Sequence, residues 1–135
     1  MVVSPNILAL DVGTRRVGIA MASAAARLPQ PLTTLQRDDS FFEKLKALIE
    51  SENIGQLVIG LPRSLSGDAT GQTKATQTFV AELKRQFDVP VQLQDEAVTS
   101  KQAEKELQSR GRTYRREDID ALAATYILED FLNEG

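Results

Sequence analysis

The sequence of 135 residues predicts a single α/β domain, residues 1–135, built around a mixed five-stranded sheet. Two observations favour this fold class. The first three strand-like segments follow one another closely, and the short connection between the first two requires antiparallel pairing. The next two strand-like segments each follow a helical pattern, which is typical of parallel strands joined by crossover helices.

Each element is predicted from its own pattern. Short apolar runs bounded by turn residues indicate strands at residues 6–13, 17–22, 31–36, 56–61 and 89–93. Apolar residues at helical spacing indicate helices at residues 40–49, 75–87, 99–109 and 116–132. Asp39 and Ser40 are the candidate caps of the first helix, and Gly111 separates the last two helices. The segment 62–71 is rich in Ser, Gly, Asp and Thr and is predicted to be a loop.

The composition excludes several kinds of chemistry. The chain contains no Cys and no His, which removes disulfides, thiol nucleophiles, thiolate or imidazole zinc sites and histidine bases. A protein-bound metal must therefore accept hard oxygen ligands, which favours Mg²⁺ or Mn²⁺. No apolar run approaches the length of a membrane span, and the N-terminus lacks the pattern of a signal peptide. We expect a cytoplasmic protein with no membrane partner.

Charge is unevenly distributed along the chain. The net charge is −3, but residues 101–116 carry a local balance of +4, so the remainder carries −7. A basic segment on an acidic body can contact phosphates locally; the alternative is a solvated helix face and loop. The basic residues of this segment are Lys101, Lys105, Arg110, Arg112, Arg115 and Arg116.

Two acidic positions adjoin strand-like segments. Asp11 interrupts the apolar run 7–12, where an ionised carboxylate is costly unless it is paired or binds a metal. The alternative is that Asp11 caps the following turn together with Thr14. Asp95 and Glu96 directly follow the fifth apolar run, and alternation along that strand does not decide which of them faces a site.

A third acidic position lies on the last predicted helix. At 100° per residue, Asp120 falls within the apolar arc of this helix and Asp118 falls outside it. The alternative is a first-turn aspartate that the helix dipole favours. Taken together, three carboxylates near one edge of a sheet indicate a site for one or two Mg²⁺ or Mn²⁺ ions, a chemistry suited to phosphodiester hydrolysis.

Four segments stand out together: LALDVGTRRVGIA (8–20), VIGLPRSLSGDATGQ (58–72), QDEAVTS (94–100) and DIDALAATYIL (118–128). In this order they resemble the YqgF/RuvX family, whose members are described as Holliday junction resolvases and as nucleases of the 16S ribosomal RNA precursor. The resemblance implies a ribonuclease H-like fold, with three antiparallel strands, then two parallel ones, and flanking helices. It implies that Asp11, Glu96 and Asp120 are catalytic and bind the metal. Ala97 stands where family members usually have arginine.

The resemblance also implies a function. We expect a metal-dependent nuclease that acts on structured nucleic acid, with the 5′ end of the 16S rRNA precursor as substrate in ribosome biogenesis. The alternatives are a Holliday junction resolvase in DNA recombination or repair and a non-catalytic RNA-binding module for ribosome assembly. The expected phosphate contacts come from the turn after the first predicted strand and from the basic segment 101–116. The residues are Thr14, Arg15, Arg16, Lys101, Arg110, Arg112, Arg115 and Arg116.

Two further expectations concern ligands and assembly. The segment from Asp11 to Gly18 also resembles the phosphate turn of the actin, hexokinase and sugar-kinase group. Those proteins need a second domain to close over ATP, which a chain of this length does not supply. The sequence shows no interface stripe, so we expect a monomer or a weak homodimer.

Overall fold

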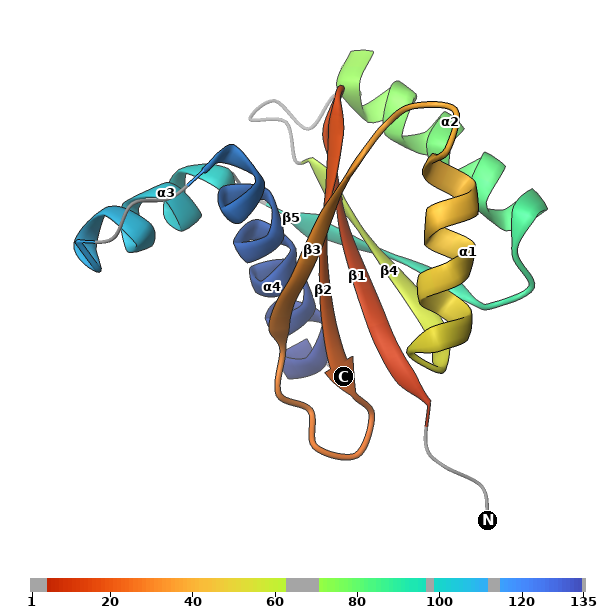
Figure 1. Ribbon diagram of the computed structural model, residues 1–135, viewed down its shortest axis with the longest axis horizontal. Coiled ribbons are helices and arrows are strands. Elements are labelled where there is room, and N and C mark those ends of the chain that lie inside the picture. Colours follow the sequence, from red (N-terminus) through yellow and green to blue (C-terminus); the bar gives the residue numbers. More distant parts are fainter. Residues whose placement is uncertain (1–4, 63–70, 97–98, 112–114, 135) are drawn as a thin grey trace.

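The computed structural model describes residues 5–62, 71–96, 99–111 and 115–134 (Figure 1). Its elements, in chain order, are β1 (Asn6–Val12), β2 (Arg16–Ser23), β3 (Gln30–Gln36), α1 (Phe41–Ser51), β4 (Ile54–Pro62), α2 (Gly71–Gln86), β5 (Val91–Glu96), α3 (Thr99–Ser109) and α4 (Arg116–Glu134). Within these ranges no helix is long and apolar enough to cross a membrane.

The sheet has the predicted mixed topology. Its strand order is β3-β2-β1-β4-β5, with β1 at the centre. The β1–β2 and β2–β3 pairs are antiparallel, and the β1–β4 and β4–β5 pairs are parallel. Because β1, β4 and β5 run in the same direction, their carboxyl ends meet at one edge of the sheet.

The strand and helix boundaries differ from the predicted ones in places. β5 begins at Val91, two residues later than predicted, and continues through Glu96. Pro90 precedes it and has no amide hydrogen to donate to the sheet, although its carbonyl accepts a hydrogen bond from Leu57. α2 begins at Gly71, four residues before its predicted start.

The cap of α1 also differs from the prediction. Ser40 occupies the N-cap position, but its side chain makes no capping hydrogen bond. Instead the amide and hydroxyl of Ser40 both donate to Asp38 Oδ1, at 2.9 and 2.6 Å. These two hydrogen bonds lower the pKa of the exposed Asp38 carboxyl. Asp38, rather than Asp39, therefore organises the turn before the helix.

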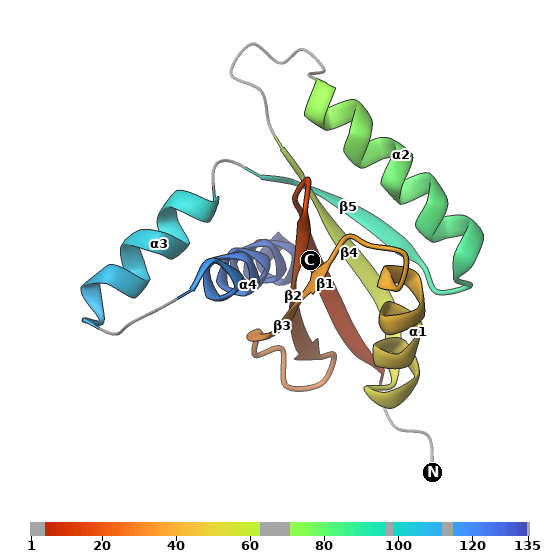
Figure 2. The same cartoon turned by 45° about the horizontal axis from the view of Figure 1, so that its top comes forward.

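Helices cover the two faces of the sheet in separate layers. α1 and α2 lie on one face, and α4 lies on the other with α3 beside it (Figure 2). Leu8 and Leu10 of β1 pack in the cluster that contains residues of α1 and α2. Ile7 and Ala9 alternate with them and pack in the cluster that contains residues of α4. Asp11 is in phase with Ile7 and Ala9, so its position lies on the α4 face.

Candidate active site

Asp11 lies near the carboxyl end of β1, between two glycines. Its neighbour on β2 is Gly18, and its neighbour on β4 is Gly60. Neither neighbour carries a side chain, so α4 can approach the sheet closely on both sides of the carboxylate. A β-carbon on Gly60 would overlap the side chain of Ile127, and one on Gly18 would overlap the backbone of Asp120. The two glycines therefore fix how deeply α4 docks beside Asp11.

The first turn of α4 is held by hydrogen bonds as well as by this close contact. Thr34 of β3 donates its hydroxyl to the carbonyl of Glu117 at 2.7 Å. The backbone amide of Arg115 donates to Asp118 Oδ2 at 2.9 Å, a side-chain cap at the start of the helix. Asp118 is exposed and serves as the cap, whereas Asp120 is partly buried against the sheet. The predicted difference between these two aspartates is confirmed.

Asp120 forms an ion pair with Arg16, the first residue of β2. Arg16 Nε donates to Asp120 Oδ2 at 2.6 Å, and the two side chains are 24% and 17% exposed. This hydrogen bond raises the pKa of the Arg16 guanidinium above its ordinary value. Arg16 was expected to contact phosphate; in the structure its guanidinium is bound to a carboxylate of the site. No local pattern predicts this pairing, because the two residues are 104 positions apart and meet only where α4 docks against β2.

The environment of Asp11 disfavours its charged form. Burial, followed by the negative charge of Asp120, raises the pKa of the Asp11 carboxyl to about 6. A bound cation would offset both effects. Two neighbouring carboxylates also supply the hard oxygen ligands that Mg²⁺ and Mn²⁺ prefer. The residues present therefore fit a divalent metal.

Glu96 ends β5 in register with Pro62 of β4. It comes two residues after Gln94, which is buried and paired with Gly60. Because side chains alternate along a strand, position 96 lies on the same face of the sheet as Gln94. Gln94 is in register with Gly60, the β4 neighbour of Asp11, so this is the α4 face. The side chain of Glu96, and the whole of Ala97, lie outside the described residues. Among the side chains that the structure describes, no group of three acidic residues forms a metal cluster.

Apart from Arg16, the predicted phosphate-binding residues fall into three groups. Thr14 and Arg15 are exposed in the turn before β2, and Arg115 and Arg116 are exposed where α4 begins. Arg110 is paired with Glu106 through Nη2 and Oε1 at 2.6 Å. The side chain of Lys101 and all of Arg112 lie outside the described residues. Arg15 directly precedes Arg16, whose side chain contacts Asp120, and Arg115 and Arg116 begin the helix that carries Asp120.

Arg37 supports the turn between β1 and β2 and was not singled out from the sequence. Its Nη1 donates to the carbonyl of Gly13 at 2.9 Å, and its backbone amide donates to the carbonyl of Arg15 at 2.8 Å. Its guanidinium also lies over the ring of Phe79 on α2, 4.8 Å from the ring centre. No local pattern reveals these contacts, since they join three separate elements.

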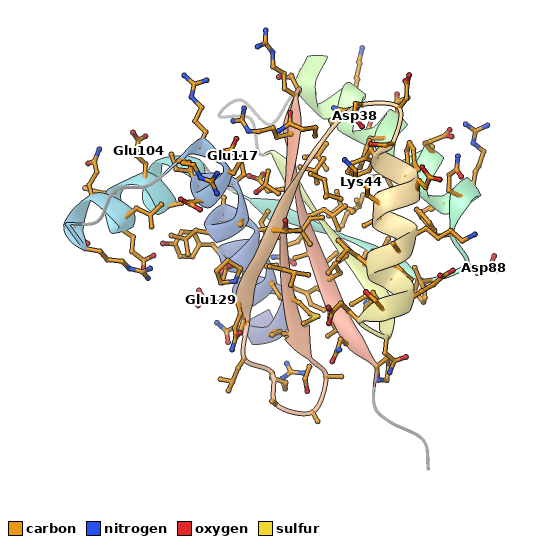
Figure 3. The ribbon with its side chains drawn as sticks, viewed as in Figure 1. Asp38, Lys44, Asp88, Glu104, Glu117 and Glu129 are labelled. Carbon is orange, nitrogen blue, oxygen red and sulfur yellow. The ribbon has the colours of Figure 1, made fainter. Side chains whose placement is uncertain are left out.

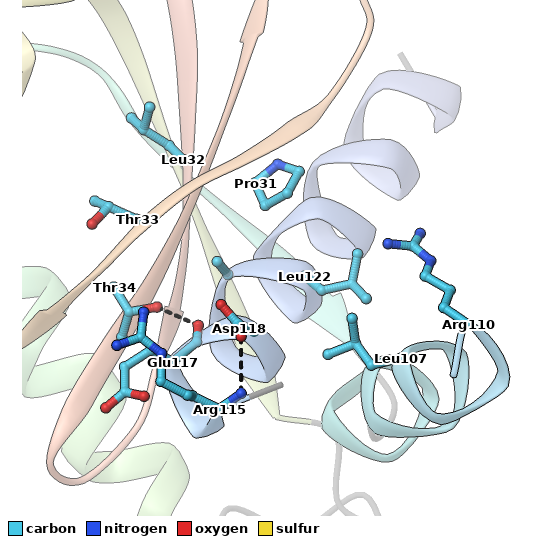
Figure 4. Close-up of a pocket in the computed structure, with 11 residues that line it drawn as sticks. Pro31, Leu32, Thr33, Thr34, Leu107, Arg110, Arg115, Glu117, Asp118 and Leu122 are labelled. Carbon is cyan, nitrogen blue, oxygen red and sulfur yellow. Dashed lines mark hydrogen bonds between the residues drawn. The ribbon is translucent and has the colours of Figure 1, made fainter. Parts of the chain in front are cut away.

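A cavity of about 700 Å³ lies on the outer side of the α4 start, between β3, α3 and α4 (Figure 4). Leu32, Leu107 and Leu122 supply apolar lining, and Arg110 and Arg115 supply positive charge. Glu117, also labelled in Figure 3, and Asp118 add negative charge to the same lining. Asp11 and Asp120 do not line this cavity.

Comparison with known proteins gives consistent results. A family model described as RuvX, Holliday junction resolvase, matches residues 5–134. A protein of Maridesulfovibrio salexigens is 38% identical over 131 residues, covering 94% of this chain and 97% of its own. One of Thermoanaerobacter pseudethanolicus is 34% identical over 133 residues, covering 95% and 96%. Both are named "Putative pre-16S rRNA nuclease".

A solved structure is similar over the whole fold. It is titled "T. thermophilus RuvC in complex with Holliday junction substrate", and it aligns with a TM-score of 0.55 at 14% identity, covering 96% of this chain and 95% of that one. At this identity the likeness shows the fold, which is ribonuclease H-like. The full-length family match and the two relatives show that the chain belongs to the RuvX family.

Proposed function

We propose that this protein is a nuclease that hydrolyses phosphodiester bonds in structured nucleic acid, and that its substrate is the 5′ end of the 16S rRNA precursor. The observation that carries the proposal is that Gly18, the sheet neighbour of Asp11, packs against the backbone of Asp120, which brings Asp120 to the carboxyl end of β1. The names of the relatives from Maridesulfovibrio and Thermoanaerobacter support the choice of substrate.

Asp11, Asp120 and Glu96 would hold one or two Mg²⁺ or Mn²⁺ ions. Bound there, the metal would supply an activated water and stabilise the leaving oxygen of the phosphodiester. The protein's own contribution is to hold its carboxylates in place before substrate arrives. Asp11 is fixed by the central strand, and Asp120 is fixed by the contact of its backbone with Gly18.

Exposed arginines would bind the substrate backbone around these carboxylates. Arg15 extends from the β1–β2 turn, and Arg115 and Arg116 extend from the start of α4. Arginine suits this role because its planar guanidinium makes bidentate hydrogen bonds to phosphate.

Ribosomal RNA processing would place the protein in the cytoplasm. We propose that the chain forms a single domain and acts there as a monomer or weak homodimer.

A Holliday junction is the second candidate substrate. The family model is described by that activity, and the RuvC structure of the same fold was solved with such a junction. The two candidates share the chemistry of hydrolysis and differ in the shape and sugar of the nucleic acid.

A side-by-side cleavage assay distinguishes the candidates. A 5′-extended 16S rRNA precursor and a four-way DNA junction are each incubated with the protein in Mn²⁺, in Mg²⁺ and in EDTA. We expect faster cleavage of the RNA, dependent on the metal. Faster cleavage of the junction would favour resolution, and binding without cleavage of either substrate would favour an assembly module and contradict the nuclease.

A further inference from the structure

The proposed function assigns the carboxylate of Asp120 to metal binding, and in the structure this carboxylate is paired with Arg16. Arg16 Nε and Asp120 Oδ2 are 2.6 Å apart, which is a short, charge-assisted hydrogen bond. Both side chains are largely shielded from water, with exposed fractions of 24% and 17%. An ion pair in such a setting is stronger than one on the open surface, where water and salt screen it.

The backbone geometry makes this pair a built feature of the site. Arg16 comes two residues before Gly18 on β2, and Gly18 lies against the backbone of Asp120. The strand that carries the arginine and the helix that carries the aspartate are therefore in direct contact. Gly13 closes the turn before Arg16 by donating its amide to the carbonyl of Arg16 at 2.9 Å. The backbone that carries the Arg16 guanidinium is therefore held next to Asp120.

We propose that Arg16 is a positioning residue that holds Asp120 while the site is free of metal and is displaced from it when a divalent cation binds. This inference rests on the proposed metal site. A guanidinium on the carboxylate competes with a cation for the same oxygen, and its positive charge repels the incoming ion. Arg16 therefore lowers the affinity for metal while holding the Asp120 side chain in place.

Displacement leaves a permanent positive charge at the edge of the site. Arginine does not lose its proton in proteins, so the released guanidinium needs a new anionic partner. A phosphate of the substrate would supply one next to the exposed Arg15. Metal and nucleic acid are then expected to bind cooperatively, because each favours the displaced position of Arg16.

If the role of Arg16 were purely structural, removal of its side chain would have the opposite effect on metal affinity. If Arg16 only fixed α4, its removal would loosen Asp120 and weaken metal binding. If Arg16 competes with metal, its removal strengthens metal binding. The sign of the change in Mn²⁺ affinity therefore separates the two roles without reference to cleavage activity.

The test is calorimetric titration of the metal-free, full-length protein with Mn²⁺ alone. We expect Arg16→Gln to bind Mn²⁺ roughly five- to tenfold more tightly than wild type, the range expected for loss of a competing charge-assisted contact. The matched control is Arg15→Gln, which removes the same charge from the neighbouring exposed residue and should change the affinity less than about twofold. Arg16→Lys keeps the charge and should remain closer to wild type than Arg16→Gln.

The outcomes separate this inference from the proposed function. Equal or weaker Mn²⁺ binding by Arg16→Gln, with Mn²⁺ binding retained in wild type, would overturn the displacement and leave the metal site standing. Absence of Mn²⁺ binding in wild type and in all variants would overturn both. If Arg16→Gln does not fold, Arg16→Lys decides, since a longer, weaker contact to Asp120 should still raise Mn²⁺ affinity, and affinity at or below wild type would contradict displacement.

Discussion

Gly18 of β2 packs against the peptide backbone of Asp120 on α4, so closely that a β-carbon at this position would overlap the carbonyl oxygen of Asp120. Gly18 is also the direct neighbour of Asp11 in the sheet. One residue without a side chain thus brings together two carboxylates that lie far apart in the sequence. The depth at which α4 docks is therefore part of the candidate site.

Gly18→Ala tests this contact. The obstacle is backbone, so the helix must move, and we expect the free energy of unfolding to fall by about 2–3 kcal/mol. Gly60→Ala is the matched control, because there the obstacle is the side chain of Ile127, which can change rotamer. Urea denaturation measures both variants. A loss for Gly18→Ala no larger than for Gly60→Ala would contradict a backbone contact that fixes α4.

Asp11→Asn tests the buried charge through its pH dependence. The pKa of the Asp11 carboxyl is about 6 in the fold against an ordinary value of 3.8. Between these values the folded state keeps a proton that the unfolded state has lost, so this residue makes stability fall as pH rises from about 4 to about 6. Above pH 6 the folded state carries the full free-energy cost of the ionised Asp11 carboxylate. Asparagine at position 11 carries no such charge.

We therefore expect metal-free Asp11→Asn to be more stable than wild type at pH 8, by roughly 2–3 kcal/mol, and similar to wild type near pH 4. Denaturant unfolding in EDTA at the two pH values provides the measurement. A stability difference that is the same at pH 4 and pH 8 would show that burial of this carboxylate has no energetic cost in the fold.

Tyr126→Phe tests how α3 is attached to α4. The hydroxyl of Tyr126 donates to Glu106 Oε2, and Glu106 also pairs with Arg110. Loss of the hydroxyl should lower stability by about 1 kcal/mol and speed amide exchange in α3. A double-mutant cycle with Glu106→Gln should show coupling, whereas a cycle with the exposed Glu104→Gln should show none. Equal coupling in both cycles would rule out a specific contact.

Arg115→Gln tests the proposed phosphate contacts at the start of α4. Arg115 is exposed beside the turn that carries Asp120, so its loss should weaken RNA binding and reduce the salt dependence of binding by about one ion. Lys84→Gln is the control, since Lys84 is exposed near the end of α2, at the opposite edge of the sheet. Fluorescence anisotropy across a salt series measures both. Identical slopes for the two variants would mean that this surface does not contact the RNA backbone.

The sequence predicts the local structure well because local patterns carry it. The short apolar run 7–12 identifies β1, and the helical angle of Asp120 within α4 separates it from Asp118. These properties depend on neighbours within a few residues. The turn before α1 is local as well, yet there the prediction named Asp39, whereas the structure has Asp38 accepting hydrogen bonds from the amide and hydroxyl of Ser40.

Local sequence patterns do not predict the pairing of Arg16 with Asp120. The two residues are 104 positions apart, and their contact depends on how closely α4 approaches β2. Arg16 looks from its local sequence like one of two exposed arginines in a turn. Only the docking of α4 against Gly18 makes it the partner of an acidic residue, so its role becomes visible in the assembled fold.

The most direct test of the carboxylate site is metal-dependent cleavage of the 16S rRNA precursor by Asp120→Asn, compared with Asp118→Asn from the same helix turn. Asp118 caps the helix, and asparagine retains an oxygen that accepts the capping hydrogen bond. We expect Asp120→Asn to lose cleavage in Mn²⁺ while still binding RNA, and Asp118→Asn to cleave like wild type. Wild-type cleavage by folded Asp120→Asn would contradict the carboxylate site.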